Sequence, residues 1–291
     1  MADGADRIHV ALAADANYRP GLETTRETII RSCSRPERLE FHVFDESALA
    51  KLPEVEGLGD WNGSRMPNLR LWLAELLPTV DRIVYADVDT LWFRDIVELW
   101  DRPQTEPIAW VRDLRVTRER ALSGWLGTVT GGGFDPSRYC CSGVCVMNLK
   151  WMRETDFVSE VRRLLSAPGR PEYPDQDVLN AIFNSRSEIL PPEWDALGDC
   201  ENLPRDWRHA VYHVTGAGRH FHAAKPPVYP PQHEFWWHVA HGTRDYSFRA
   251  RLFARLWPLH WLARLLPMDI RFRLVRQLFF ARLAIKGEKG E

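Results

Sequence analysis

Two carboxylates, Asp87 and Asp89, follow a short apolar run over 83–86. The run predicts a buried strand. Residues i and i+2 of an extended chain point to the same side, so both carboxylates can converge just past the strand end. Carboxylates that close repel unless a cation lies between them, and oxygen ligands suit Mg²⁺ or Mn²⁺, which often also bind substrate phosphates. The alternative is a solvated turn after a strand.

A third candidate ligand is His213, at the end of a strand-like segment over 210–214. A neutral imidazole there could complete the shell of a cation held by Asp87 and Asp89. The glycines that follow it would let backbone N–H groups approach a phosphate. A less favoured alternative is a zinc site made of His209, His213, His220 and His222.

The segments that must position these side chains alternate between strand and helix. Apolar patterns predict a strand over 8–14, a helix over 23–31 and a strand over 39–44, with a turn at Pro20 and Gly21. This order predicts a parallel, right-handed crossover unit. The loop that carries Asp15 and Asn17 would then lie at the carboxyl edge of the sheet, where ligands bind. These two residues could bond a base or ribose, or could instead be turn or helix-cap residues.

Four further segments carry candidate residues. A helix over 68–77 holds Arg70, which either snorkels or anchors a carboxylate or sugar hydroxyl. A strand over 108–111 ends at Asp113, and a buried strand over 139–149 contains Ser142 and Gly143. A helix starts at residue 174, so Asp175 lies near its positive end. The polar, Gly-rich stretch over 115–138 predicts a mobile loop or lid.

Composition limits the possible classes of protein. The 291 residues suffice for one large domain or two small ones. A net charge of −2 gives no indication of nucleic-acid binding by the whole chain. Five cysteines fit no metal framework, so we expect reduced thiols in a cytosolic protein. We expect no signal peptide, and no apolar run reaches the roughly 18 residues of a membrane span.

The C-terminal part has a different composition. From 249 to 282, Arg recurs among Leu, Phe and Trp, and Asp269 is the single acidic residue. We therefore divide the chain into a catalytic domain over 1–245 and a basic, aromatic helical tail over 246–291. Such helices suit an anionic membrane surface. The alternative is that they pack on the catalytic domain.

Taken in order, the motifs resemble the family 8 retaining glycosyltransferases, including bacterial lipooligosaccharide α-galactosyltransferases. The resemblance covers roughly residues 7–225. The motifs that carry it are Ala13-Ala14-Asp15-Ala16-Asn17-Tyr18, Val84-Tyr85-Ala86-Asp87-Val88-Asp89-Thr90-Leu91, Ser142-Gly143-Val144 with Met147-Asn148-Leu149, Asp175-Gln176-Asp177-Val178-Leu179-Asn180, and His213-Val214-Thr215-Gly216.

The resemblance implies an α/β GT-A fold: a Rossmann-like, mixed and mostly parallel sheet flanked by helices. It implies a UDP-sugar donor and Mn²⁺, with Mg²⁺ as an alternative, bound by Asp87, Asp89 and His213. Arg70 would lie near the donor sugar, Asp113 would face the acceptor, and Asp175 and Gln176 would lie beneath the reacting sugar. The implied donor contacts are Ala13, Asp15, Asn17, Asp87, Val88, Ser142, Gly143, Gly216 and either Arg219 or Lys225.

One departure bears on the donor. Where the family often has Asn, this chain has Cys141, so a donor-binding amide becomes a thiol.

We expect retaining transfer of a hexose to a saccharide or lipid-linked acceptor, as in lipopolysaccharide biosynthesis, on the inner face of the cytoplasmic membrane. The alternatives are a UDP-sugar-binding protein without turnover, and a nucleotidyltransferase or metal-dependent hydrolase.

Overall fold

The computed structural model describes residues 7–50, 52, 58–61, 63–197 and 209–213. The predicted domain boundary after residue 245 and the predicted basic tail over 246–291 lie outside these residues, and both stay predictions. Among the described helices, none is long and apolar enough to cross a membrane. The cysteines within the described ranges are all free thiols, namely Cys33, Cys140, Cys141 and Cys145.

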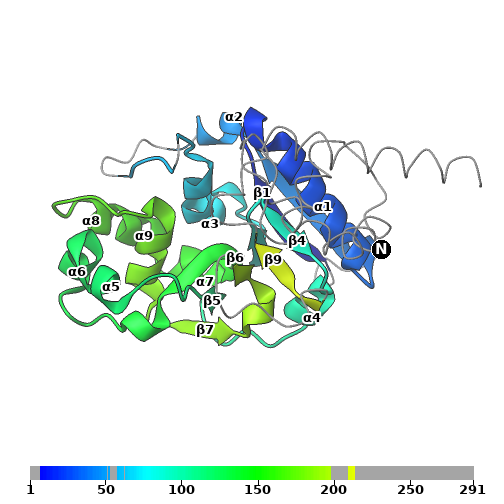
Figure 1. Ribbon diagram of the computed structural model, residues 1–291. Coiled ribbons are helices and arrows are strands. Elements are labelled where there is room, and N and C mark those ends of the chain that lie inside the picture. Colours follow the sequence, from blue (N-terminus) through cyan, green and yellow to red (C-terminus); the bar gives the residue numbers. More distant parts are fainter. Residues whose placement is uncertain (1–6, 51, 53–57, 62, 198–208, 214–291) are drawn as a thin grey trace, which may run out of the picture. The chain divides into compact units, whose positions relative to one another are not determined.

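Strands and helices alternate along the first half of the chain (Figure 1). The strands are β1 (Ile8–Ala13), β2 (Leu39–Phe44), β3 (Arg82–Ala86), β4 (Thr90–Trp92), β5 (Ile108–Arg112), β6 (Cys140–Asn148), β7 (Ser187–Leu190), β8 (Ala196–Leu197) and β9 (Val211–His213). The α-helices are α1 (Arg19–Ser32), α2 (Glu46–Leu49), α3 (Leu73–Leu76), α4 (Ile96–Trp100), α5 (Arg118–Leu122), α6 (Gly124–Thr130), α7 (Leu149–Glu154), α8 (Phe157–Leu165) and α9 (Pro174–Phe183).

The central sheet has the strand order β2-β1-β3-β6-β5-β7. Strand β6 is antiparallel to both of its neighbours, and the other neighbouring pairs are parallel. The expected mixed, mostly parallel sheet is therefore confirmed. The expected parallel crossover is formed by β1, α1 and β2.

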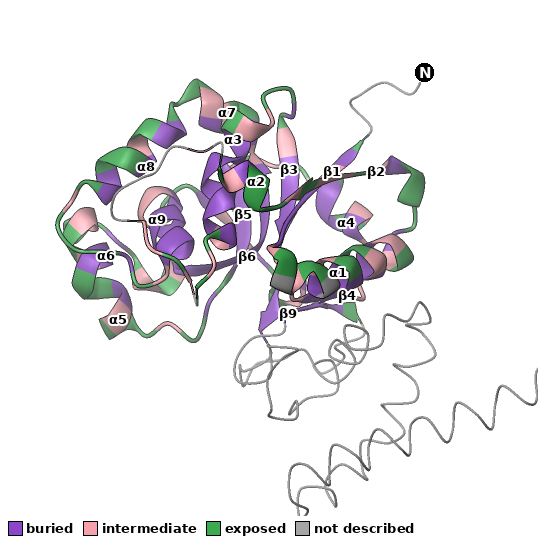
Figure 2. Ribbon diagram, turned by 90° about the horizontal axis from the view of Figure 1, so that it is seen from above, coloured by how far each residue is buried: buried purple, intermediate pink, exposed green. Residues whose placement is uncertain are grey.

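Two apolar clusters cover the two faces of this sheet. In β3, Ile83 and Tyr85 belong to a cluster that also contains apolar residues of α3, α7, α8 and α9. The alternate residues, Val84 and Ala86, belong to a second cluster, which includes residues of α1 and α4. Figure 2 shows the buried strands between these two groups of helices. Because both faces are covered, the strands read as continuous apolar runs in the sequence.

A smaller sheet has the order β4-β9-β8. Strand β9 pairs antiparallel with β4, which places His213 opposite Thr90. It also pairs in parallel with β8, with Leu197 opposite His213. This pairing links residues near 90 to residues near 213, which are far apart in sequence.

Two expectations about local structure were wrong, and a third was right only in part. The turn expected at Pro20 and Gly21 is the first turn of α1, a position where the fixed φ of proline suits a helix. The segment expected as a helix over 68–77 is helical, but most of it is a 3₁₀ helix, η4 (Met66–Trp72), followed by one α-helical turn. The loop expected over 115–138 contains α5 and α6, and Arg120 of α5 forms an ion pair with the buried Asp177 of α9. Its role as a lid stays a prediction.

One buried side chain joins α9 to β6. The amide of Asn180, which is fully buried, donates to the Cys140 carbonyl at 2.8 Å and accepts from the Cys140 N–H at 2.8 Å. Asn180→Leu should lower the free energy of unfolding by about 2–4 kcal/mol, since two buried backbone groups lose their partner. Denaturant unfolding measures this change. Glu154→Ala on the exposed face of α7 is the control and should change it by less than about 0.5 kcal/mol; equal effects would contradict the prediction.

Candidate active site

The candidate residues gather at the carboxyl edge of the parallel strands. Strand β6 runs the other way, so its first residues lie at the same edge as the end of β3. The N–H of Asp87 donates to the carbonyl of Gly143 at 2.7 Å, which fixes this junction. The end of β5, which leads to Asp113, and the N-terminus of α9 lie beside the start of β6.

Asp87, Asp89 and His213 converge there. Each offers one ligand atom, and these atoms lie within 4.8 Å of one another. The Nε2 atom of His213 is 3.2 Å from Oδ1 of Asp89 and 3.8 Å from Oδ2 of Asp87. Both carboxylates keep partial exposure, 25% and 18% of the side chain, so the group is open to a ligand on one side. Two oxygens and one imidazole nitrogen at this spacing can hold a divalent cation.

The Asp87 carboxyl has an unusual environment. Burial and the neighbouring Asp89 together raise its pKa to about 6, against the opposing charge of the Arg70 guanidinium. A cation beside the two carboxylates would favour their charged forms. Asp87 and Asp89 therefore repel each other when both are charged, and a bound cation would offset this repulsion.

Asp195 orients the imidazole, and the sequence alone did not indicate this residue. It follows the 3₁₀ helix η6 (Pro192–Trp194), and its Oδ1 lies 2.9 Å from Nδ1 of His213. A carboxylate on one imidazole nitrogen fixes the ring so that the other nitrogen faces the cation. Burial alone would lower the pKa of His213, but Asp195 and Asp89 raise it well above its ordinary value. A cation bound at Nε2 would replace the proton there, because only an unprotonated imidazole nitrogen can act as a ligand.

Cys141 lies near the same nitrogen of this imidazole as Asp195 does. Its Sγ is 3.9 Å from Nδ1 of His213, and Cys141, Asp195 and His213 form a second, fully buried group of possible ligands. Burial raises the pKa of the Cys141 thiol to about 12. The thiol is therefore protonated near neutral pH and is a poor metal ligand there. Position 141, where the family often has a donor-binding amide, thus carries a thiol that lies beside His213.

Gly143 is required by the close approach of β6 to the imidazole. A Cβ atom at this position would overlap Cε1 of His213, and would lie 2.5 Å from its Nδ1 and 3.2 Å from Oδ2 of Asp87. A glycine inside a strand often marks such a close approach, and here the group approached is the imidazole.

Arg70 is the cation inside this cluster. Its side chain is 2% exposed, and it forms ion pairs with Asp87 at 2.7 Å and Asp175 at 3.0 Å. It also donates to the carbonyl of Ser142, and its guanidinium lies over the Tyr85 ring at 4.2 Å. The snorkelling alternative is wrong, because the guanidinium is buried between two carboxylates.

The N-terminus of α9 supplies two more of the predicted residues. Asp175 accepts from the Ser142 hydroxyl at 2.8 Å, and Oε1 of Gln176 accepts from the Ser142 N–H at 3.1 Å. The Gln176 amide nitrogen donates to Asp113 at 3.2 Å. Burial raises the pKa of Asp113, but hydrogen bonds and the charge of Arg115 outweigh it, so the pKa is lowered. This carboxylate is therefore ionised and already paired.

The remaining predicted donor contacts fall into two groups. Ala13 and Val88 are buried next to this edge, and Asp15 caps the turn before α1 by accepting from Tyr18 N–H at 3.1 Å and from the Ser64 hydroxyl at 2.8 Å. Asn17 lies in the 3₁₀ helix η2 (Ala16–Tyr18). The others lie outside the described residues, namely Gly216, Arg219 and Lys225.

A mixed, mostly parallel sheet with an acidic pair at the end of a central strand is the architecture of GT-A glycosyltransferases. The family model described as "Glycosyl transferase family 8" matches residues 61–217, more than half of the chain. The chain therefore belongs to glycosyltransferase family 8, and it is a glycosyltransferase. The resemblance drawn from the motifs is confirmed.

Two relatives indicate the range of this family. The lipopolysaccharide 1,2-glucosyltransferase of Escherichia coli K12 is 26% identical over 262 residues, which cover 77% of this chain and 75% of that protein. The glucoside xylosyltransferase 2 of Mus musculus is 26% identical over 297 residues, covering 86% of this chain and 64% of that protein. The chain thus matches less than two thirds of the mouse protein.

Solved structures share the fold. The apo structure of the bifunctional glycosyltransferase WbbM aligns with a TM-score of 0.61 at 19% identity, covering 84% of this chain and 51% of that one. The galactosyltransferase LgtC in complex with donor and acceptor sugar analogues aligns with a TM-score of 0.55 at 21% identity, covering 84% and 95%. These alignments confirm the GT-A fold.

Removing the buried guanidinium should destabilise the protein strongly. Arg70→Met leaves the carboxylates of Asp87 and Asp175 buried without their cation, which costs about 3–5 kcal/mol of unfolding free energy. Urea unfolding followed by circular dichroism measures the loss. Arg162→Met, the same substitution at an exposed position of α8, is the matched control. If both variants unfold at the same urea concentration, the buried ion pairs do not have the role assigned to them.

Proposed function

We propose that this protein transfers a hexose from a UDP-sugar to a saccharide or lipid-linked acceptor, with retention of the α configuration and with Mn²⁺, or Mg²⁺, as cofactor. The observation that carries the proposal is the convergence of Asp87, Asp89 and His213 Nε2 at the carboxyl edge of the sheet. Family membership supports the reaction class.

The residues present fit a divalent cation. The two carboxylates and the imidazole would bind it, and Asp195 would hold the imidazole in place. The cation would stabilise the negative charge of the departing diphosphate. Mn²⁺ accepts both oxygen and imidazole ligands, which favours it over Mg²⁺ here.

The chain's own groups would bind and orient the donor. The family resemblance implies that Asp87 and Arg70 lie near the donor sugar, and the guanidinium pairs with that carboxylate at 2.7 Å. Ala13, Asp15, Asn17 and Val88 would line the nucleotide side. The remaining donor contacts in this proposal are Ser142, Gly143, Gly216 and either Arg219 or Lys225.

Gln176 favours front-face transfer over a double displacement. An amide is a poor nucleophile, and both ends of this amide are engaged in hydrogen bonds, with Ser142 N–H and Asp113. The acceptor hydroxyl would attack from the face that the diphosphate leaves, and a phosphate oxygen would take its proton. Asp175 would help to orient the sugar, and Asp113 would face the acceptor.

The relatives bear on substrate and location. The Escherichia coli relative is named for transfer of glucose to lipopolysaccharide, and the mouse relative for transfer of xylose. We propose a lipid-linked saccharide as acceptor, in a protein at the inner face of the cytoplasmic membrane whose tail over 246–291 contacts anionic lipid. Recognition of the donor sugar would differ from that of family members with Asn at position 141, since the Cys141 thiol faces His213.

A panel of UDP-sugars tests the reaction. With Mn²⁺ present, one UDP-hexose should release UDP well above the others, and transfer to an acceptor should give an α-linked product. Asp89→Asn should lower kcat/KM by about a hundredfold or more, since it removes a charged ligand. Glu188→Gln, at the far edge strand β7, is the control and should retain activity.

Other outcomes separate the alternatives. A β-linked product would contradict retention, and release of UMP or pyrophosphate would identify a nucleotidyltransferase. Binding of a UDP-sugar without UDP release, even by slow hydrolysis, would identify a binding protein.

A methyl group at position 143 should weaken the cation site without removing a ligand. Gly143→Ala would push His213 away from the carboxylates, since the added Cβ overlaps the imidazole. We expect Mn²⁺ affinity, measured by calorimetry, to fall about tenfold or more. Gly133→Ala is the matched control, because a Cβ there meets only the Thr130 carbonyl at 3.5 Å. Unchanged affinity in Gly143→Ala would show that His213 does not bind the cation.

A further inference from the structure

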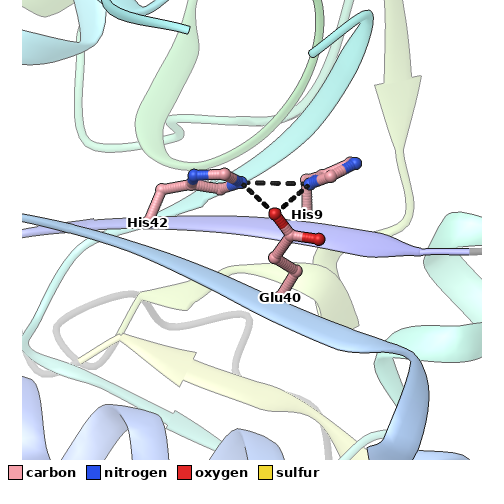
Figure 3. A group of neighbouring side chains, drawn as sticks. All are labelled: His9, Glu40 and His42. Atoms are coloured by element: carbon pink, nitrogen blue, oxygen red, sulfur yellow. Dashed lines mark hydrogen bonds and ion pairs between the residues drawn. The ribbon is translucent and has the colours of Figure 1, made fainter. Parts of the chain in front are cut away.

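A second group of ligating side chains lies at the edge of the central sheet. His9 is on β1, and Glu40 and His42 are on the neighbouring edge strand β2. The register pairs His9 with Glu40 and Ala11 with His42, so the three side chains emerge on one face. Figure 3 shows both imidazoles and the carboxylate pointing toward a common centre.

The distances within this group match a coordination shell. Nδ1 of His9 lies 3.0 Å from Nε2 of His42, and Oε1 of Glu40 lies 3.8 Å and 3.9 Å from these two nitrogens. A circle through three points with these separations has a radius of about 2.1 Å, the length of a Zn–N or Zn–O bond (about 2.0–2.2 Å). A cation near this centre would therefore need little movement of the ligands, and a tetrahedral shell completed by a fourth ligand would draw Glu40 slightly closer to the two imidazoles.

Burial and neighbouring charges shift the pKa of both imidazoles. Burial lowers the pKa of both His9 and His42, and Glu40 opposes both shifts. The charge of Arg7 lowers the pKa of His9 further, and His9 lowers the pKa of His42 further. When the two facing nitrogens bond to each other, one of them carries the hydrogen; for both to bind a cation, that ring would adopt its other tautomer, with the hydrogen on its outer nitrogen.

The group is accessible and separate from the proposed active site. The side chains of His9 and His42 are 17% and 16% exposed, and that of Glu40 is 46% exposed, which leaves room for a water as fourth ligand. His9 is near the first residue of β1, whereas the candidate active site lies past its last residue, Ala13, about 13 Å further along the strand.

We propose that His9, Glu40 and His42 form a second cation site, of the zinc class, that ties the edge strand β2 to β1. Two imidazoles and one carboxylate suit Zn²⁺, whereas the oxygen-rich group at Asp87 and Asp89 suits a harder ion. A cation bound by two strands stabilises the native state, because the unfolded chain does not hold the three ligands together.

The experiment uses the full chain carrying His213→Ala, which removes the ligand shared by the other two ligand groups of the described residues. Zn²⁺ alone is titrated by calorimetry, and Tm is recorded against zinc concentration. We expect one zinc per chain and a Tm that rises with zinc. Adding His9→Ala or His42→Ala should lower zinc affinity by about tenfold or more and abolish the Tm rise. Adding His209→Ala, at an exposed histidine, is the matched control and should change neither.

Two results would overturn the site. The first is unchanged zinc affinity in His9→Ala and His42→Ala, or its loss in His209→Ala instead. The second needs no substitution among the three ligands: Co²⁺ added to the His213→Ala chain, once circular dichroism shows it folded, should give the visible absorption of a four-coordinate ion with nitrogen and oxygen ligands, and the absence of these bands would exclude the site. Glu40→Gln, which preserves the shape of the side chain, should weaken binding while retaining the fold.

Discussion

The structure depends on holding several carboxylates together at one edge of a sheet. Asp87 and Asp175 are far apart in the sequence, yet both pair with the buried guanidinium of Arg70. Asp89 and Asp195 bracket the imidazole of His213 in the same way. Buried charges of one sign are tolerated only when opposite charges face them. The protein therefore carries fixed positive groups where it concentrates negative charge.

Residues of both sheets form this edge. The central sheet brings the ends of β3 and β6 together, and the small sheet brings β9 to β4. The second pairing matters because it places His213 opposite Thr90, directly beside Asp89. Gly143 completes the arrangement, since no side chain fits between β6 and the imidazole. The site is therefore a product of strand register, and a slip of one residue would turn its side chains to the other face.

Local patterns in the sequence predicted much of the fold and part of the candidate site. The apolar runs predicted the core strands, and Asp87 with Asp89 indicated a cation because carboxylates two apart on a strand share a face. The strand expected over 39–44 has the bounds of β2. Expectations failed where long-range contacts accompany structure that the local sequence does not indicate: in the polar stretch over 115–138, Arg120 of α5 pairs with a buried carboxylate of α9, and α6 packs on α9. Pro20 begins a helix instead of forming a turn.

The sequence by itself determined the alternation of strands and helices, the acidic pair and the family, since these depend on residue type and short spacing. Only the tertiary structure decided which distant groups meet. Asp195 has no distinctive neighbours in sequence, and its role follows from lying 2.9 Å from Nδ1 of His213. Arg70 was ambiguous until its guanidinium was found between two carboxylates. The grouping of His9 with Glu40 and His42 likewise depends on the register of two parallel strands, which spacing along the chain does not encode.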